Sequence, residues 1–231
     1  MFEFLLLDMD DTILDFKKAE QVALEKTLRS FSLVPTAEVC ARYSQINQSY
    51  WEMLERKEIT REKLKIQRFG DLFREYGIQI DSQLCAKRYV ENLAQGHYFV
   101  PGAEAAVASL SKKYKLYLVS NGATDVQMSR LGSAGIEKYF QKVFISQEVG
   151  VDKPDKVFFE RCFAQIPDFD QKKAIIVGDS LTSDIQGGIN AGITTCWINP
   201  NKKPARADIP ADYEIEALSQ LEALLENLAS P

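Results

Sequence analysis

Short apolar runs alternate with stretches of helical periodicity along most of the chain. Five runs rich in Val, Ile and Leu have the length of β-strands, at residues 2–7, 115–119, 143–145, 174–177 and 194–198. Continuous apolar character over such a length is typical of strands buried on both faces of a sheet. Amphipathic segments separate them at residues 103–110, 125–134, 155–163 and 183–191, and Gly135 and Gly192 stand where helices are expected to end. This alternation predicts an α/β fold in which helices cover both sides of a parallel sheet.

One segment, from about residue 17 to residue 95, breaks the alternation. It contains no strand-like run, and apolar residues recur in it every three or four positions, as they do at Val39, Tyr43, Ile46, Tyr50 and Leu54. A further apolar stripe at residues 217–228 predicts a closing helix of the main fold. We therefore predict two domains: an α/β core made of residues 1–16 and 97–231, and an inserted all-helical domain of residues 17–96.

Composition and charge exclude several classes of function. The net charge is −5 and the chain has no long stripe of Lys and Arg, so a nucleic acid polymer is not an expected partner. The longest apolar run near the start, residues 4–7, is too short for a signal peptide or a membrane span, so we expect a cytoplasmic protein without a membrane partner. The four cysteines lie far apart and His97 is the only histidine, which argues against a zinc site and a Ser-His-Asp hydrolase.

Acidic residues directly follow two of the predicted strands. Asp8 and Asp10 come after the first strand, and Asp179 follows the fourth, with Asp184 five residues further on. The carboxyl ends of parallel strands form one edge of a sheet, so these carboxylates are expected to lie together. Such a cluster is unfavourable unless a cation neutralises it, and oxygen ligands beside a phosphate site suit Mg²⁺. Either motif alone would also fit an ordinary turn in which Asp caps a helix.

Two further motifs supply groups that suit a phosphate. Ser120 and Asn121 follow the second predicted strand and offer a hydroxyl, an amide and backbone donors before a helix. Lys153 precedes Pro154 in the first turn of another predicted helix, where the backbone is restrained. Helix capping or a surface turn would explain each motif by itself. Together with the acids, they provide what phosphoryl transfer requires: a carboxylate nucleophile, a second acid, metal ligands and groups that bind phosphate.

The order of these motifs resembles that of the haloacid dehalogenase superfamily. Four motifs of that superfamily are matched in turn by Asp8-Met9-Asp10-Asp11-Thr12, Ser120-Asn121, Lys153-Pro154 and Gly178-Asp179-Ser180 with Asp184. The resemblance covers essentially the whole chain. It implies a Rossmann-like core with a helical cap domain inserted after the first motif, at the place where the pattern of the chain predicts an insert.

The resemblance also implies a role for each site residue. Asp8 would attack phosphorus to form an aspartyl-phosphate, and Asp10 would protonate the leaving alcohol and then activate the water that hydrolyses this intermediate. The remaining implied roles are binding of Mg²⁺ by Asp8, the Asp10 backbone carbonyl and Asp179; binding of phosphate by Ser120, Asn121 and Lys153; and support of the site by Thr12 and Asp184.

Asp10 and Asp11 bear on the choice of reaction within the superfamily. A halide leaves without a proton, and the dehalogenase branch typically lacks the second acid of the first motif, so Asp10 argues against dehalogenation. Asp11 stands where many phosphoglycolate phosphatases and sugar phosphomutases have Gly. The Asp-Asp-Thr sequence, the all-helical insert and Ser120-Asn121-Gly122 look more like the pyrimidine 5′-nucleotidase group.

The expected partner is therefore a small phosphorylated metabolite, in particular a pyrimidine nucleoside monophosphate, bound by a monomer or homodimer. Tyr43, Tyr50, Trp51 and Phe69 offer either a face on which a base stacks or the core of the cap. Hydrolysis of phosphoglycolate or sugar phosphates, a phosphomutase of the same fold and a non-catalytic binding module are the alternatives. The binding module is the least favoured of these, because all the acids of the motifs are present.

Overall fold

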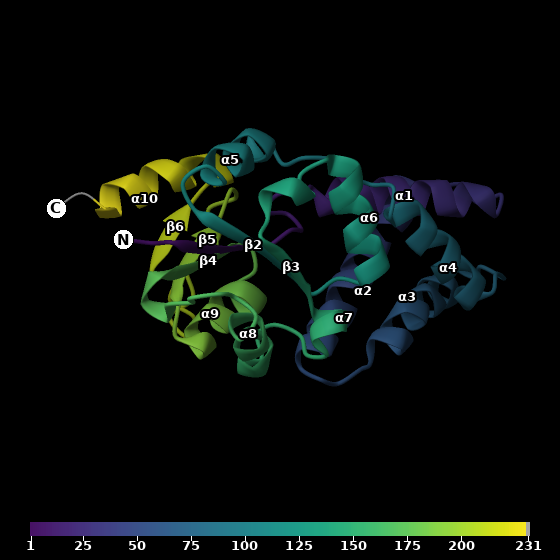
Figure 1. Cartoon of the computed structure of the whole chain (residues 1–231). Coiled ribbons are helices and arrows are strands. Elements are labelled where there is room, and N and C mark those ends of the chain that lie inside the picture. The colour runs from purple at the N-terminus through teal and green to yellow at the C-terminus, as the bar shows by residue number, and fades with distance from the viewer. Residues whose placement is uncertain (230–231) are drawn as a thin grey trace. The chain divides into compact units, whose positions relative to one another are not determined.

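The structure is a computed structural model that describes residues 1–229 (Figure 1). Contacts between Cα atoms divide the chain into two compact units. The first contains Met1–Asp15 and the described residues from His97 onward, and the second is Phe16–Gly96. No helix within residues 1–229 is long and apolar enough to cross a lipid bilayer.

The first unit is built on a six-stranded sheet in which every neighbouring pair is parallel, in the order β3-β2-β1-β4-β5-β6. The strands are β1 (Phe4–Leu7), β2 (Lys115–Ser120), β3 (Lys142–Ile145), β4 (Ala174–Gly178), β5 (Thr194–Ile198) and β6 (Tyr213–Ile215). This confirms the predicted α/β fold and all five predicted strands. The sequence did not predict β6, because three residues with Glu214 in the middle carry no apolar run.

Alternate residues of β1 pack against two different layers of helices. Phe4 and Leu6 face α8 and α9, whereas Leu5 and Leu7 face α5, α6 and α10. Figure 1 shows α8 and α9 on one side of the sheet and α5 and α10 on the other. Complete burial of a Leu or Phe side chain contributes about 1.5–3 kcal/mol relative to exposure, so both layers hold β1 in place. The helices are α5 (Ala103–Leu110), α6 (Thr124–Ala134), α7 (Ser146–Val149), α8 (Lys156–Phe163), α9 (Gln186–Ala191) and α10 (Leu221–Ala229).

The register of the central strands sets the position of the site. β1 lies between β2 and β4, and its last residue, Leu7, is paired with Leu118 and Val177. The backbone N–H of Asp8 continues the ladder, donating to the carbonyl of Val177 at 2.9 Å. The residues that end or follow β1, β2 and β4 therefore meet at the carboxyl edge of the sheet.

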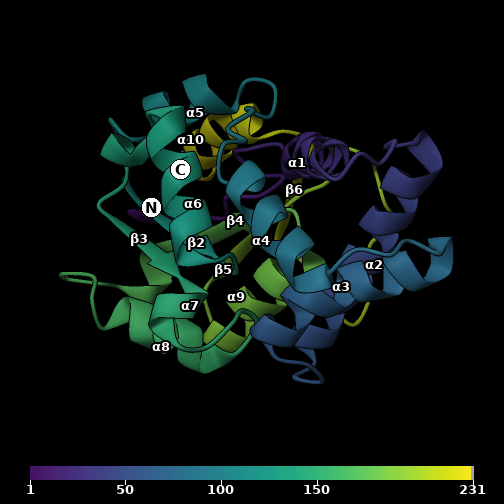
Figure 2. The ribbon, with the colours of Figure 1, turned by 90° about the vertical axis from the view of Figure 1, so that its right-hand side faces the viewer.

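The second unit consists of four helices: α1 (Phe16–Ser30), α2 (Ala37–Glu55), α3 (Arg61–Tyr76) and α4 (Ser82–Leu93). Within it α1 packs on α4 and α2 packs on α3 (Figure 2). Thr36, Thr60 and Asp81 cap the N-termini of α2, α3 and α4 with their side-chain oxygens. Gly77, with φ of 63°, ends α3 in the left-handed conformation.

Two aromatic residues proposed as a stacking face belong to the core of this unit. Tyr43 and Phe69 are 0% exposed, and their ring centroids lie 5.0 Å apart. Both rings also pack on Tyr89, at 5.5 and 5.4 Å. Of the two roles that the sequence left open for Tyr43 and Phe69, a stacking face or a core, the core is correct, because neighbouring helices cover both rings. Tyr50 is buried too, and its hydroxyl donates to Asp71 Oδ2 at 2.7 Å.

Candidate active site

Lys153 and Asp8 form a buried ion pair at the carboxyl edge of the sheet. Lys153 Nζ donates to Asp8 Oδ1 at 2.7 Å, to Asp184 Oδ1 at 2.7 Å and to the carbonyl oxygen of Val119 at 3.0 Å. Lys153 is only 1% exposed, and these three bonds use all the protons of its ammonium group. The cation is therefore fixed beside Asp8, the carboxylate for which the family resemblance implies the role of nucleophile.

Burial and charge shift the pKa values of this pair. Burial, and after it the negative charge of Asp184, raise the pKa of Asp8 well above its usual value, against the opposing effect of Lys153. Burial alone would lower the pKa of Lys153, but the carboxylates of Asp184 and Asp8 outweigh it, so that pKa is raised. Strongly shifted groups with specific charged partners are typical of functional sites.

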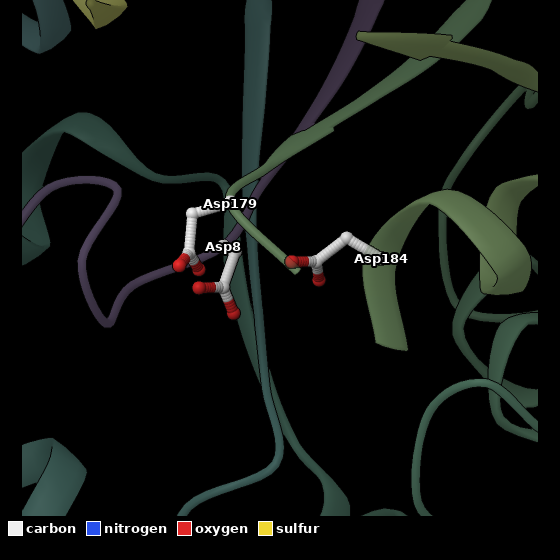
Figure 3. Close-up of side chains that lie close together, drawn as sticks. All are labelled: Asp8, Asp179 and Asp184. Atoms are coloured by element: carbon white, nitrogen blue, oxygen red, sulfur yellow. The ribbon is translucent and has the colours of Figure 1, made fainter. Parts of the chain in front are cut away.

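Three carboxylates converge at this edge. The ligand atoms of Asp8, Asp179 and Asp184 lie within 4.8 Å of one another. In Figure 3 the carboxylates of Asp8 and Asp179 lie side by side, and that of Asp184 extends toward them. One Lys153 ammonium cannot neutralise three negative charges. The cluster could hold a divalent cation, and carboxylate oxygens are the ligands that Mg²⁺ prefers.

The backbone after β4 is shaped to bring Asp184 into this cluster. Residues Leu181–Ile185 form a π-helical turn, η3, that precedes α9, so the predicted helix at residues 183–191 begins in a wider coil. Asp184 Oδ2 accepts from the backbone N–H of Ser180 at 3.2 Å. A Cβ atom on Gly178 would lie 2.1 Å from Asp184 Oδ2, so glycine is required there for this close approach.

The motif at the end of β2 divides into two roles. Ser120 is buried, and its Oγ accepts from the backbone N–H of Gly122 at 3.1 Å. Asn121 donates from Nδ2 to the carbonyl of Lys153 at 2.9 Å and to Ser183 Oγ at 3.2 Å, and its Oδ1 accepts from the backbone N–H of Lys153 at 2.8 Å. The Asn121 amide therefore ties the backbone of Lys153 to β2. These contacts use both N–H groups and the oxygen of the Asn121 amide. The phosphate-binding role assigned to Asn121 stays a prediction.

Asp10 lies at the same edge but is held by a different helix. Gln127 Nε2 donates to Asp10 Oδ2 at 2.7 Å, and Arg130 Nη1 donates to Asp10 Oδ1. Both partners come from α6, which follows the Ser120 motif. The structure therefore brings Asp8, Asp10, Ser120, Lys153, Asp179 and Asp184 to one edge of the sheet.

The loop between Asp8 and the second unit is a tight turn. The backbone N–H groups of Ile13 and Leu14 donate to the carbonyl of Met9, at 3.0 and 2.9 Å. Asp11 has φ of 54°, a left-handed conformation that glycine adopts more readily than Asp. Thr12 is completely buried, and among residues 1–229 its hydroxyl has no hydrogen-bond partner. Its predicted support of the loop would therefore come from packing.

Sequence reasoning missed three residues of this edge: Gln127, Arg130 and Trp197. Trp197 Nε1 donates to the backbone carbonyl of Asp179 at 2.9 Å and so fixes the main chain that carries this acid. A signal existed for the pair on α6, whose buried stripe contains Val126, Gln127, Arg130 and Leu131. Two polar residues in an otherwise apolar stripe indicate a buried polar partner, here Asp10.

Comparison with known proteins gives relatives that match over nearly the whole of this chain. The chain is 38% identical over 231 residues to YfnB of Bacillus subtilis, a HAD-hydrolase by name, covering 99% of this chain and 98% of that protein. It is 38% identical over 221 residues to the pyrimidine 5′-nucleotidase PynA of Streptococcus pneumoniae, covering 95% and 93%. The pyrimidine 5′-nucleotidase YjjG of Escherichia coli is 29% identical over 224 residues, covering 97% and 98%.

A crystal structure of YfnB, described as bound to magnesium and as revealing interdomain movement, matches this structure with a TM-score of 0.93 at 38% identity, covering 97% of this chain and 98% of that one. The family model for haloacid dehalogenase-like hydrolases matches residues 5–198, which contain all the acids of the site. The chain therefore belongs to the family of haloacid dehalogenase-like hydrolases.

Proposed function

We propose that this hydrolase is a Mg²⁺-dependent phosphatase that cleaves small phosphate monoesters through an aspartyl-phosphate on Asp8. The observation that carries the proposal is the Asp8 carboxylate at the end of β1, bonded to Lys153 at 2.7 Å and grouped with Asp179 and Asp184. A nucleophilic carboxylate next to a fixed cation and further metal ligands is the arrangement that phosphoryl transfer to an acid requires.

The proposed reaction has two steps, formation and hydrolysis of the aspartyl-phosphate, and the residues at this edge of the sheet have different roles in them. In the first, an Asp8 oxygen bonds to phosphorus as the ester oxygen leaves, and Asp10 supplies the proton that this oxygen needs. In the second, water attacks phosphorus as the bond between phosphorus and the Asp8 oxygen breaks, which releases inorganic phosphate and restores the Asp8 carboxylate, and Asp10 accepts the proton of that water. The Ser120 hydroxyl would bind an oxygen of the transferring group. Lys153 offsets the repulsion between Asp8 and a dianion, and it would bind a phosphoryl oxygen by exchanging one of its three hydrogen bonds.

The acid cluster is the proposed Mg²⁺ site. Asp8, Asp179 and the backbone carbonyl of Asp10 would hold the ion, with Asp184 in support, and YfnB supplies a magnesium-bound relative of the same fold. When bound, the ion neutralises charge on the phosphoryl group and on the acids around it.

Binding of Mg²⁺ is expected to raise the midpoint of thermal unfolding of the wild-type chain. At about a hundredfold excess of ion over its dissociation constant, binding stabilises the folded state by about 2.7 kcal/mol. At roughly 2–4 °C per kcal/mol for a chain of this size, the midpoint rises by about 5–11 °C. Differential scanning fluorimetry with and without chelator measures this rise.

Two substitutions serve as comparisons for the Mg²⁺ measurement. Asp179→Asn removes a proposed ligand and should lose most of the rise. Asp208→Asn removes a carboxylate that is exposed and paired with Arg206, and should keep it. No rise in the wild-type chain, or an equal rise in Asp179→Asn, would contradict the proposed metal site.

The proposed substrates are nucleoside monophosphates, with pyrimidine bases preferred. Two relatives that cover nearly the whole chain are named pyrimidine 5′-nucleotidases, and this supports the class of substrate. The helical unit Phe16–Gly96 occupies the segment for which the sequence predicts a cap, and that role stays a prediction.

A panel of phosphate monoesters tests the proposed function. Purified protein with Mg²⁺ is expected to release phosphate from pyrimidine nucleoside monophosphates faster than from sugar phosphates or phosphoglycolate. Preference for a sugar phosphate or phosphoglycolate would support the proposed phosphatase activity and contradict the proposed nucleotidase activity. Release from none of the esters would overturn both, and isomerised sugar phosphates in the same mixtures would indicate a mutase.

A further inference from the structure

Two buried polar residues of α6 connect the two motifs that the proposed reaction uses for acid–base chemistry and phosphate binding. Gln127 is 2% exposed and Arg130 is 0% exposed. The Gln127 amide nitrogen donates to Asp10 Oδ2 at 2.7 Å and to Ser120 Oγ at 2.8 Å. Its Oε1 accepts from Arg130 Nη1 at 3.0 Å, and the same Arg130 nitrogen also contacts Asp10 Oδ1.

The orientation of the Gln127 amide follows from its neighbours. Arg130 carries only donors and the Asp10 carboxylate only accepts, so the carbonyl oxygen of Gln127 must face Arg130 and its nitrogen must face Asp10. Reversing the amide would place two oxygens in contact and two donors in contact. Both N–H groups of Gln127 are therefore committed, one to Asp10 and one to Ser120.

This arrangement also determines the direction of the Ser120 hydroxyl. Its oxygen accepts two hydrogen bonds, from Gln127 Nε2 and from the backbone N–H of Gly122. A hydroxyl oxygen has two lone pairs, so its proton remains available to donate to another group. In the proposed reaction that group is an oxygen of the phosphoryl group.

Packing holds the Gln127 side chain in this position. A Cβ atom on Gly122 would lie 2.3 Å from Gln127 Cγ, so the side chain lies directly against a backbone that must be glycine. Val126 and Leu131, on either side of the pair in the sequence, are buried in the same stripe and anchor α6. Asp10, in contrast, lies on a loop and its side chain is 30% exposed, so its orientation depends on these partners.

We propose that Gln127 is a positioning residue that holds the Asp10 carboxylate and the Ser120 hydroxyl in register, with Arg130 fixing the Gln127 amide. The inference rests on the proposed phosphatase function and deepens it. Proton transfer to a leaving group requires a donor placed to within a fraction of an ångström, and a 1 Å displacement costs roughly 10²-fold in rate. Gln127 thus acts through Asp10 and Ser120, the two residues to which its amide nitrogen donates.

The test compares two esters that differ in their need for a proton. The first is the best alkyl phosphate of the panel, whose leaving group departs as an alcohol and needs the proton of Asp10. The second is p-nitrophenyl phosphate, whose leaving group departs as a stabilised anion and needs no proton. In Gln127→Met, which keeps the length of the side chain and removes its hydrogen bonds, kcat/KM for the alkyl ester should fall about 10²-fold. For p-nitrophenyl phosphate the fall should be at least tenfold smaller.

A matched control lies at the opposite edge of the sheet, before β4. Gln171 also donates two hydrogen bonds from Nε2, to the carbonyls of Ala191 at 2.7 Å and Gly192 at 3.0 Å. It also lies against a glycine, 2.6 Å from a Cβ atom built on Gly192. Gln171→Met should therefore leave the ratio of the two kcat/KM values unchanged.

A double-variant cycle separates positioning from general loss of structure. If Gln127 acts through Asp10, adding Gln127→Met to Asp10→Asn should change the ratio no further. Arg130→Lys, which keeps the charge but loses the planar fork, should shift the ratio in the same direction and serves if Gln127→Met does not fold. Equal losses on both esters, or an additional change of the ratio in the double variant, would overturn the inference. The proposed function is tested separately by measuring turnover of both esters in the wild-type chain and in Asp8→Asn. It requires that the wild type hydrolyses both esters and that Asp8→Asn hydrolyses neither.

Discussion

Replacing Asp8 with asparagine is expected to abolish phosphate release. Asparagine keeps the shape of the side chain at the end of β1 but cannot form the acyl phosphate, and loss of a nucleophile typically costs about 10³-fold or more in turnover. The measurement is release of phosphate from the best ester of the panel, with burst kinetics to detect the covalent intermediate in the wild-type chain. Release from Asp8→Asn within tenfold of wild type would contradict the assignment of Asp8 as nucleophile.

The same substitution is expected to stabilise the protein when no metal is present. Burial and the Asp184 charge raise the pKa of Asp8, so folding disfavours its ionised form. A group whose pKa is higher in the folded state contributes stability below its unfolded pKa and loses it as the pH rises through the folded pKa. The unfolding midpoint of Asp8→Asn in chelator should therefore exceed that of wild type by an amount that grows as the pH rises above about 4, the usual pKa of an Asp side chain.

A gain of about 0.5–2 kcal/mol is the usual range for stabilising substitutions, and corresponds to roughly 1–8 °C here. In saturating Mg²⁺ the wild-type chain should have the higher unfolding midpoint of the two, because binding of the ion stabilises wild type more than Asp8→Asn. A variant that is less stable than wild type at every pH in chelator would mean that the ion pair with Lys153 outweighs the burial of Asp8.

The strands and the acids could be predicted because each depends on local pattern. Buried parallel strands require continuous apolar runs, and the first residues after β1 and β4 are placed by the strands themselves. Asp8 and Asp179 therefore follow from the sequence once the sheet is assigned. The parallel order adds that these ends meet, which the pairing of Leu7 with Leu118 and Val177 bears out.

The residues that orient these acids could not be predicted, because their contacts join distant parts of the chain. Gln127 reaches Asp10 across 117 positions, and Trp197 bonds the backbone of Asp179 across 18. The polar positions in the buried stripe of α6 indicate that Gln127 has a polar partner, but nothing in the local sequence of Gln127 or Trp197 identifies which residue that partner is. The π-helical turn at Leu181–Ile185 depends on its hydrogen bonds rather than on apolar period, so the pattern predicted an ordinary helix start.

Tyr43 and Phe69 illustrate a different limit. An aromatic stripe at helical spacing suits a helix core and a ligand face equally well, since both require apolar surface on one side. Tertiary packing decides between them. Contact with Tyr89 on α4, far along the chain, is what buries both rings.

Replacing Lys153 with methionine is expected to destabilise the protein strongly, in contrast to the change at Asp8. Methionine fills the space of the side chain but leaves the carboxylates of Asp8 and Asp184 without their shared cation. Removal of one partner from a buried ion pair costs about 3–5 kcal/mol, which lowers the unfolding midpoint by roughly 6–20 °C. Lys156→Met is the matched control, because Lys156 is exposed and pairs with Glu160 at 3.1 Å on the surface of α8, an interaction of about 0.3–0.5 kcal/mol.

The opposite signs expected for Asp8→Asn and Lys153→Met distinguish a functional cluster from a structural ion pair. In a structural pair either substitution leaves one buried charge uncompensated, and both variants lose stability. Here three carboxylates lie close together and one ammonium bonds two of them, so removing an acid relieves repulsion and removing the cation increases it. Addition of Asp184→Asn to Lys153→Met should therefore recover part of the lost midpoint, by a non-additive coupling of the two sites. A further loss in that double variant would show that Asp184 and Lys153 stabilise the fold independently, and that the excess of negative charge is not what a metal ion would neutralise.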